Sequence, residues 1–318
     1  MKWYHSIKIK LLGFFLFLCI AFILTLIITF SMLRESQFQE NALKETSLAT
    51  HKALSYIREK QIEAEVIASA LSSIYEKDLY DTHTNKTLIP SILETSLSNH
   101  IHMQSAGIWF EPYSIYKEEK NHMLFFNRSQ DNKFYSTDAY LPPNKMNYRD
   151  MTFYRLGKAL KDNEIAWTNV YTDPVTKIRM LTVVSPIYRQ NKFIGVASLD
   201  LAIGNKDKKF WSNLDKKDRY IFAVDKKGFY IGKSNLLEQY TKNSDNIYDI
   251  QASPVKHLID TLKPTLERHD HKNEDAYEIP KDLFMIDNDP ILHTNSIVVT
   301  YHLPSTHWHI IIGIRESN

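Results

Sequence analysis

The chain has 318 residues, with 39 basic and 37 acidic side chains. This near balance leaves no bulk positive charge, and no stripe of Lys and Arg alternates with aromatic residues, so we exclude nucleic acid as a partner. The single cysteine, Cys19, lies in an apolar run near the N-terminus, which excludes disulfides and thiol catalysis from the rest of the chain.

The first predicted element is a transmembrane helix at residues 11–33. The segment carries no charged side chain, and a helix of its length reaches about 35 Å, which is enough to cross a bilayer. It is longer than the apolar core of a cleaved signal peptide and lacks an evident cleavage site, so we expect a permanent anchor. Because lysines precede it, the positive-inside rule keeps residues 1–10 in the cytoplasm and places the chain after Leu33 outside.

A long helix is predicted at residues 34–80, directly after the transmembrane segment. From residue 35 onward this segment contains no glycine or proline, and its apolar and small side chains recur at helical spacing. The positions on this face are Leu54, Ile57, Ala64, Ile67, Leu71 and Ile74. The helix either holds a domain away from the bilayer as a passive stalk or carries a signal to the membrane as a lever.

The rest of the chain predicts an α+β fold with two modules of short strands and turns, residues 81–205 and 206–318. In the first module, a strand, a hairpin, a short helix and a closing hairpin are expected at residues 107–113, 122–140, 151–160 and 180–201. In the second module, a hairpin, a helix and a closing hairpin are expected at residues 219–232, 254–267 and 295–315. The charged segment 205–218 is expected to join the two modules.

Two acidic residues bracket the hairpin that closes the first module. Asp173 precedes its first strand, and Asp200 lies near the end of its second strand. If both carboxylates face one partly buried pocket, they repel, and one of them takes up a proton unless a cation arrives, which suits an ammonium ligand. The alternative is that Asp173 begins an Asp-Pro turn and Asp200 ends a strand, with both carboxylates solvated.

The order of these elements resembles the double Cache sensor domain, which forms the outer part of bacterial chemotaxis transducers, sensor histidine kinases and diguanylate cyclases. The resemblance rests on GIWFEPY, FYRLGKAL, WTNVYTD and VVSPIYRQNKFIGVASLDL in this order after a long helix, and on a weaker module that ends in STHWHIIIG. It implies two PAS-like antiparallel sheets in tandem. The membrane-distal module, residues 81–205, would carry the ligand pocket, and residues 206–318 would form the membrane-proximal module.

The resemblance also suggests which residues bind the ligand. In the amino-acid-sensing branch of the family, an Arg-x-Trp precedes a Tyr-x-Asp, and another Asp follows near the end of the next hairpin. Tyr171 and Asp173 match the second element, and Asp200 matches the third. Met151 and Phe153 stand where the arginine and the tryptophan would be. The resemblance implies that the two aspartates and the tyrosine hydroxyl hold the ammonium group of a ligand.

Met151 cannot replace the arginine that would clamp a ligand carboxylate with two hydrogen bonds. Arg149 or Arg179 lies near enough in sequence to reach into the pocket from another direction. Otherwise the pocket favours an amine without a carboxylate, such as a polyamine or a methylated amine, whose apolar part would rest on Trp109, Phe153 and Met151. We therefore expect a small ligand that is an amine or an amino acid, and no cofactor.

Three His-x-His pairs would each place two imidazoles on one face of a strand, as zinc sites require. They are His100 and His102, His269 and His271, and His307 and His309. No Cys, Asp or Glu accompanies them at a recognisable spacing, so we expect no metal site. Trp167 and Trp308 are expected to be core residues, and Trp308 is expected to pack the last strand against the long helix.

No catalytic motif is present, because the sequence lacks a Gly-x-Ser-x-Gly turn, a His-Glu-x-x-His helix and a glycine-rich phosphate loop. We expect a sensor rather than an enzyme. It would be a homodimeric, single-pass protein of the bacterial inner membrane, with its ligand-binding domain in the periplasm or outside the cell. The alternatives are an extracytoplasmic hydrolase and a membrane-anchored interaction module that binds no ligand.

In the resembling receptors, a second transmembrane span and an output domain follow the sensor domain. The chain ends at Asn318 without a second apolar run or a recognisable kinase or cyclase. We therefore expect either the N-terminal part of a longer receptor or a free-standing sensor that signals through a partner.

Overall fold

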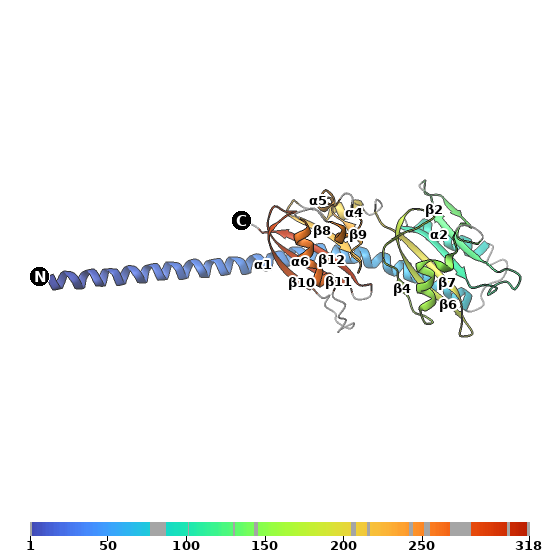
Figure 1. The fold of residues 1–318 in the computed structure, drawn as a ribbon, viewed down its shortest axis with the longest axis horizontal. Helices are drawn as coiled ribbons and strands as arrows, with labels where there is room; N and C mark the ends of the chain where they lie inside the picture. The colour runs from blue at the N-terminus through green and yellow to red at the C-terminus, as the bar shows by residue number, and fades with distance from the viewer. Residues whose placement is uncertain are drawn as a thin grey trace.

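The computed structural model describes residues 2–76, 87–100, 102–129, 131–142, 146–204, 208–214, 217–241, 244–250, 255–267, 281–303 and 306–316. Over these ranges the chain is an α+β protein with one long N-terminal helix and two antiparallel sheets, as the sequence predicts. Figure 1 shows the two modules alongside the second half of the helix, while the N-terminal half extends away from them. Part of the expected joint, at residues 205–207 and 215–216, lies outside the described residues.

The elements follow in this order after helix α1 (Lys2–Glu76). The distal module contains α2 (Ile89–Asn99), β1 (Met103–Phe110), β2 (Met123–Arg128), β3 (Phe134–Ser136), the 3₁₀ helix η2 (Tyr148–Asp150), α3 (Thr152–Ala159), β4 (Ala166–Trp167), β5 (Tyr171–Thr172), β6 (Arg179–Arg189) and β7 (Lys192–Ala202). The proximal module contains α4 (Lys208–Asn213), β8 (Arg219–Val224), β9 (Tyr230–Lys233), α5 (Asn235–Glu238), η3 (Ile247–Asp249), α6 (Val255–Leu266), β10 (Lys281–Asp289), β11 (Thr294–Leu303) and β12 (Trp308–Arg315).

Helix α1 is continuous and includes the apolar segment and the predicted long helix up to Glu76; residues 77–80 of that prediction lie outside the described residues. Its segment Lys10–Arg34 has a mean hydropathy of 3.1, is long and apolar enough to cross a membrane, and is not covered by the rest of the fold. Further along, Leu54, Ile57, Ala64 and Leu71 turn toward the sheets and are each at most 5% exposed. The helical face predicted from their spacing is confirmed.

The distal sheet has the strand order β3-β2-β1-β7-β6-β4, with β5 paired to β6. The hairpin of β6 and β7 is the one that the sequence predicts, and it turns at Gln190 and Asn191, whose φ angles are 50° and 62°. Helices α1 and α2 pack on one face of this sheet, and α3 packs on the other. The sheet itself therefore separates the face under α3 from the long helix.

Helix α2 differs from the sequence-based expectation of strands and turns after residue 81. Its buried face consists of Ile89, Leu93 and Leu97, spaced four residues apart, and Pro90 lies in its first turn, where a missing N–H leaves no helical bond unmade. Three apolar positions over so short a stretch give only a weak helical period. Strand β10 and the two-residue strands β4 and β5 are likewise absent from the sequence-based prediction.

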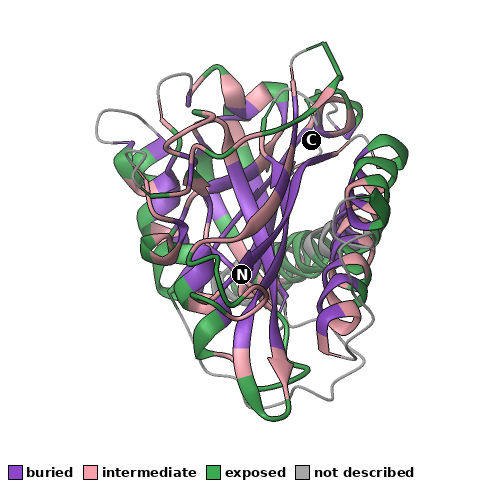
Figure 2. Ribbon diagram, turned by 90° about the vertical axis from the view of Figure 1, so that its right-hand side faces the viewer, coloured by how far each residue is buried: buried purple, intermediate pink, exposed green. Residues whose placement is uncertain are grey.

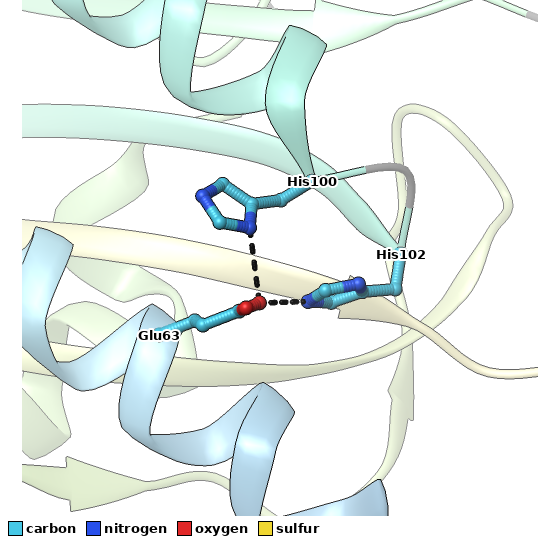
Figure 3. Close-up of side chains that lie close together, drawn as sticks. All are labelled: Glu63, His100 and His102. Atoms are coloured by element: carbon cyan, nitrogen blue, oxygen red, sulfur yellow. Dashed lines mark hydrogen bonds and ion pairs between the residues drawn. The ribbon is translucent and has the colours of Figure 1, made fainter.

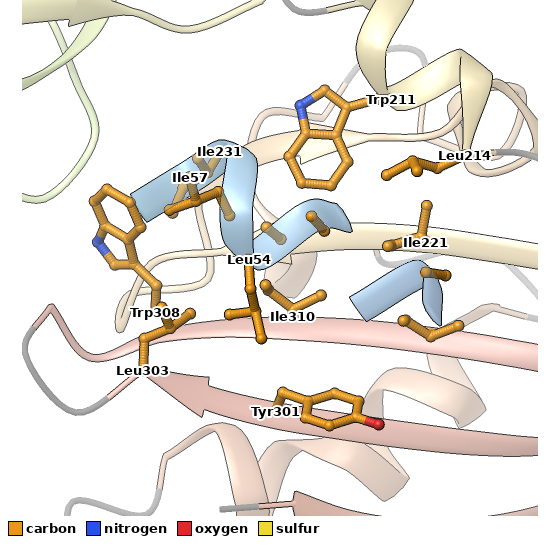
Figure 4. Close-up of a cluster of buried hydrophobic side chains, with 14 of the residues drawn as sticks. Leu54, Ile57, Trp211, Leu214, Ile221, Ile231, Tyr301, Leu303, Trp308 and Ile310 are labelled. Atoms are coloured by element: carbon orange, nitrogen blue, oxygen red, sulfur yellow. The ribbon is translucent and has the colours of Figure 1, made fainter. Parts of the chain in front are cut away.

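The proximal sheet has the strand order β10-β11-β12-β8-β9. Helix α6 packs on one face through Leu258 and Leu262, and α1 packs on the other through Leu54 and Ile57. Trp308 of β12 lies in the same cluster as this part of α1 and is 2% exposed (Figure 4). The predicted packing of Trp308 between the last strand and the long helix is confirmed.

The cluster around α1 also joins the two modules. Val170 and Leu181 of the distal module lie in the same buried cluster as Trp308, and the partly buried Trp167 packs against it. The Trp167 indole N–H donates to Glu65 Oε1 of α1 at 2.7 Å, so this residue is part of the core between module and helix, as predicted. Figure 2 shows the buried strands at the centre of the fold and exposed residues along the surrounding loops and helices.

Candidate ligand-binding site

The candidate site lies on the face of the distal sheet that packs against α3. Alternate side chains of a strand point to the same face, so Ser198 and Asp200 of β7 lie on this side together. In the antiparallel register, Asp200 stands opposite Ser105 of β1 and opposite Thr182 of β6. Asp200 therefore lies between the central strands rather than at a solvated strand end.

Asp200 is buried by these neighbours and is only 6% exposed. The Ser105 hydroxyl donates to its Oδ2 atom, and the Thr182 hydroxyl donates to its Oδ1 atom at 2.6 Å. Burial is the main cause that raises the pKa of the Asp200 carboxyl to about 7; the negative charge of Asp173 adds to the rise, and the two hydroxyl hydrogen bonds oppose it. Near neutral pH this carboxyl is thus poised between its protonated and ionised forms.

Asp173 lies in the turn between β5 and β6 and is 3% exposed. Its Oδ1 atom accepts hydrogen bonds from the backbone N–H groups of Val175 at 3.0 Å and Thr176 at 2.6 Å. The hydroxyls of Thr176 and Tyr140 donate to the same atom at 2.9 and 2.8 Å. Asp173 does form a turn, but its carboxylate is buried, and within the described part of the chain its Oδ2 atom accepts no hydrogen bond.

Two tyrosine hydroxyls complete this polar cluster. Tyr140 donates to Asp173, while Tyr171 and Thr182 share a hydrogen bond of 2.7 Å. Because the Thr182 hydroxyl donates its only proton to Asp200, Tyr171 must be the donor to Thr182. Burial raises the pKa of both tyrosines, and the charges of both carboxylates raise it further. Among the described residues, no Lys or Arg forms an ion pair with either carboxylate.

The aromatic residues predicted for the pocket lie beside this cluster. The Trp109 ring is 5.0 Å from the Phe153 ring and 5.5 Å from the Tyr140 ring, measured between centroids, and its indole N–H donates to the Ser198 hydroxyl at 2.8 Å. The ring lies across Gly107, where an added Cβ atom would be 2.8 Å from it.

Met151 is partly buried against the same aromatic residues. The structure therefore brings together six predicted residues: Tyr171, Asp173, Asp200, Trp109, Phe153 and Met151.

Neither arginine reaches the carboxylates. The Arg149 guanidinium donates to the Phe110 carbonyl at 3.0 Å, the Tyr148 hydroxyl at 2.6 Å and Asn121 Oδ1 at 2.9 Å. Arg179 pairs instead with Asp245 of the proximal module. The clamp for a ligand carboxylate that Met151 cannot provide is therefore not replaced by either residue in this arrangement.

Sequence reasoning missed the hydroxyl residues Ser105, Thr182 and Tyr140. A signal exists for Thr182, which is a polar residue between the buried apolar residues Leu181 and Val183, whereas Ser105 has the polar Gln104 beside it. Tyr140 lies in a loop and comes close to Asp173 only through the fold, so the sequence carries no local sign of its role.

A groove lies next to Phe125, whose ring contacts Tyr140 beside the acidic cluster. It has a volume of about 890 Å³ and runs along β2, where Met123, Phe125 and Leu141 line it together with His122 and Asp138. The Phe125 ring is 5.2 Å from the Tyr140 ring, and Tyr140 bonds Asp173. Phe125 thus lines the groove and contacts Tyr140, which hydrogen-bonds to Asp173 of the acidic cluster.

Comparisons with known proteins agree with this architecture. Residues 89–205 match the family of methyl-accepting chemotaxis protein-like, first PDC sensor domains. No curated protein matches the chain by sequence.

Solved structures of similar fold include three sensor domains. The periplasmic sensory domain of the Campylobacter jejuni chemoreceptor Tlp1 aligns with 87% of this chain and 96% of its own, at 13% identity and a TM-score of 0.60. The ligand-binding domain of the chemoreceptor Tlp3 from the same organism, in complex with L-valine, covers 90% and 95% at 14% identity, with a TM-score of 0.53. The extracellular domain of soHK1S-Z6, described as a histidine kinase, covers 89% and 95% at 15% identity, with a TM-score of 0.58.

These likenesses extend over both modules and the long helix. Residues 89–205 are therefore similar to PDC sensor domains of the chemotaxis-receptor type, and the chain as a whole has the double Cache fold that its sequence resembles.

Proposed function

We propose that the protein is a membrane-anchored sensor whose distal module binds a small cationic ligand between Asp173 and Asp200. One observation carries the proposal: two buried carboxylates lie in one cluster, close enough for the charge of one to raise the pKa of the other, and no described basic side chain pairs with them. Buried charges are normally paired, so such a cluster is stabilised by an arriving cation.

An ammonium group fits the hydrogen-bonding capacity of this cluster. Asp173 Oδ2 is open to a donor, and each Asp200 oxygen accepts one hydrogen bond and has a lone pair to spare. A hydrogen bond to a charged group contributes about 1.5–3 kcal/mol. Trp109 and Phe153 would contact the apolar part of the ligand, and an aromatic face also attracts a methylated ammonium.

The arginine positions favour an amine over an amino acid. Arg149 is held by Phe110, Tyr148 and Asn121, so a ligand carboxylate would have to draw the guanidinium away from these partners. The L-valine in the Tlp3 structure keeps an amino acid as the second candidate, because that domain has the same fold. The discriminating property is whether affinity requires a carboxylate on the ligand.

The surroundings of the acidic pair favour binding over hydrolysis. Among the described residues, hydroxyl groups and aromatic rings surround Asp173 and Asp200, and no histidine hydrogen-bonds to either of them. A hydrolase would require a base positioned beside its acid. We therefore assign the cluster to ligand recognition and propose no catalytic role for the chain.

The signal would leave the site through the sheet to α1. Strand β6 carries Thr182 on the site face, while Ser185 on its other face hydrogen-bonds to Ser72 of α1 at 3.1 Å. A ligand that draws β6, β7 and the Asp173 turn together would shift α1, which continues into Lys10–Arg34. In the proposed arrangement this segment crosses the bacterial inner membrane, the modules lie outside, and two chains associate as a dimer that signals to an output domain.

The test is a thermal-shift screen of the full chain in detergent against polyamines, methylated amines, amino acids, purines and small carboxylates. Amines should raise the melting temperature of the wild type, and Asp173→Asn and Asp200→Asn should each abolish the shift. Asp162→Asn, which changes an exposed carboxylate of the same module, is the control and should keep the shift. Stabilisation by carboxylates alone, or equal shifts in all variants, would exclude the acidic pair as the cation site.

A further inference from the structure

A second cluster of ligand-type side chains lies where α1 meets the start of the distal sheet (Figure 3). Glu63 projects from α1, His100 ends α2, and His102 directly precedes β1. Glu63 Oε2 is 3.0 Å from His100 Nδ1 and 3.0 Å from His102 Nε2. The potential ligand atoms of all three residues lie within 4.8 Å of one another.

These distances suit a tetrahedral metal ion. With Zn–N and Zn–O bonds of about 2.0–2.1 Å, the ligand atoms of a tetrahedral site are about 3.3 Å apart. Both Glu63 contacts are close to that value, so an ion can enter with small side-chain movements. Two imidazoles and one carboxylate are a ligand set that zinc uses when a fourth position is left to water or another group.

The three side chains of this cluster are partly exposed, and the backbone that carries the two histidines is held in place. The side chains of Glu63, His100 and His102 are 30%, 27% and 16% exposed, so the cluster lies near the surface of the protein. The buried guanidinium of Arg128 donates to the carbonyls of Leu97, His100 and Met103, which surround the two histidines in sequence. The backbone that carries both imidazoles is therefore held in place before any ion binds.

We propose that Glu63, His100 and His102 bind a divalent transition-metal ion, with Zn²⁺ as the best fit. In the sequence, no acidic residue accompanies the His100 and His102 pair at a recognisable spacing, so the pair alone predicts no metal site. The structure supplies that residue from α1, which lies far from the pair in sequence. Of the two other His-x-His pairs, His269 and His271 lie outside the described residues, and His307 and His309 belong to no metal-type cluster among the described residues.

The ion would join the long helix to the distal module by metal–ligand bonds. Without it, Glu63 Oε2 hydrogen-bonds to His100 Nδ1 and lies 3.0 Å from His102 Nε2, and such contacts break and form easily at a partly exposed position. Bound Zn²⁺ would fix the position of α1 relative to β1. Metal availability would thereby set how readily the helix moves against the module, independently of the acidic pair under α3.

The test uses the full chain in detergent after removal of metals with a chelator. Isothermal titration should show one Zn²⁺ ion per chain, with no comparable binding of Mg²⁺. Glu63→Gln and His102→Ala should each weaken Zn²⁺ binding at least about tenfold, since even residues that only support metal ligands contribute that much. Co²⁺ bound to the wild type should give the absorption spectrum of a tetrahedral site.

Two controls distinguish this site from other histidines. Glu59→Gln changes an exposed acid one turn earlier on α1, and His257→Ala removes an exposed histidine of α6; both should bind Zn²⁺ as the wild type does. Circular dichroism of each variant must match the wild type, so that lost binding is not lost folding. The proposal is overturned if the wild type binds no Zn²⁺, or if Glu63→Gln and His102→Ala bind it with unchanged affinity.

Discussion

Replacing Asp200 with asparagine tests whether the acidic cluster is buried and charged as described. Asparagine has nearly the same shape as aspartate but cannot ionise. Ser105 and Thr182 donate to different oxygens of Asp200, so one of them can still donate to the asparagine oxygen while the other must turn its hydroxyl to accept from the amide. The substitution therefore removes the ionisation of residue 200 while keeping most of its packing.

The size of the effect follows from the pKa. The carboxyl of Asp200 has a pKa of about 7 in the folded protein, against about 3.9 in an unfolded chain. Because the folded value is raised, the folded state holds the proton more tightly, so stability is highest below the unfolded pKa and is lost as the pH rises through 7. Between pH 5 and pH 8, Asp200 should cost about 2–3 kcal/mol of stability, or roughly 3–5 °C in melting temperature for a chain of this length.

The assay compares wild type and Asp200→Asn in the absence of ligand, by thermal melting of the full chain at pH 5, 6, 7 and 8. Other groups titrate in both proteins, so the difference between the two melting temperatures isolates residue 200. That difference should move in favour of the variant by roughly 3–5 °C from pH 5 to pH 8. If it stays constant, Asp200 ionises like an exposed carboxyl and the buried cluster is wrong. Asp162→Asn should show no such trend.

Three further substitutions test the packing around α1 and the two sheets. Trp308→Ala removes a side chain that is only 2% exposed. It should lower the free energy of unfolding by about 3–5 kcal/mol in urea titrations. A loss under about 1 kcal/mol would contradict the burial of Trp308. Gly232→Ala would place a Cβ atom 1.9 Å from the Trp211 ring and should cost about 1–3 kcal/mol in the same titrations, whereas a neutral result would mean that the ring moves freely. Trp167→Phe removes the indole N–H that donates to Glu65 and should lower the free energy of unfolding by about 1 kcal/mol. A double-mutant cycle with Glu65→Ala should show coupling between the two residues. Strictly additive losses of stability would argue against the hydrogen bond.

The sequence predicts those parts of the fold whose signals are local. The hairpin from Met180 to Leu201 has long runs of β-branched and apolar residues on either side of a polar turn, and the buried face of α1 repeats at helical spacing. Both are present in the structure. Helix α2 and strand β10 lack such signals, because a short element with few apolar positions is specified mainly by what it packs against.

In the candidate sites too, the sequence identifies some residues, while others come together only through tertiary packing. Asp173 and Asp200 could be selected from the sequence because they bracket one hairpin, whose register fixes the distance between its strands. Tyr140 and Glu63 could not, since each reaches its cluster from another element through tertiary packing. The convergence of Glu63 with His100 depends on how α1 rotates against α2 and β1, and no spacing along the chain encodes that rotation.

Because α1 is one continuous helix, the number of its residues between the two modules sets the angle between the modules around the helix axis. Ile57 is the last residue of α1 in the buried cluster of the proximal module, and Ala64 is the first in that of the distal module. Each helical residue adds about 100° of rotation, so one residue inserted between them would turn the distal module by more than a quarter of a circle around the helix axis. Seven inserted residues would restore the orientation to within about 20° while lengthening the protein by about 10 Å. In engineered chimeras, module exchange should therefore tolerate linkers of whole heptads in α1 and fail with intermediate lengths.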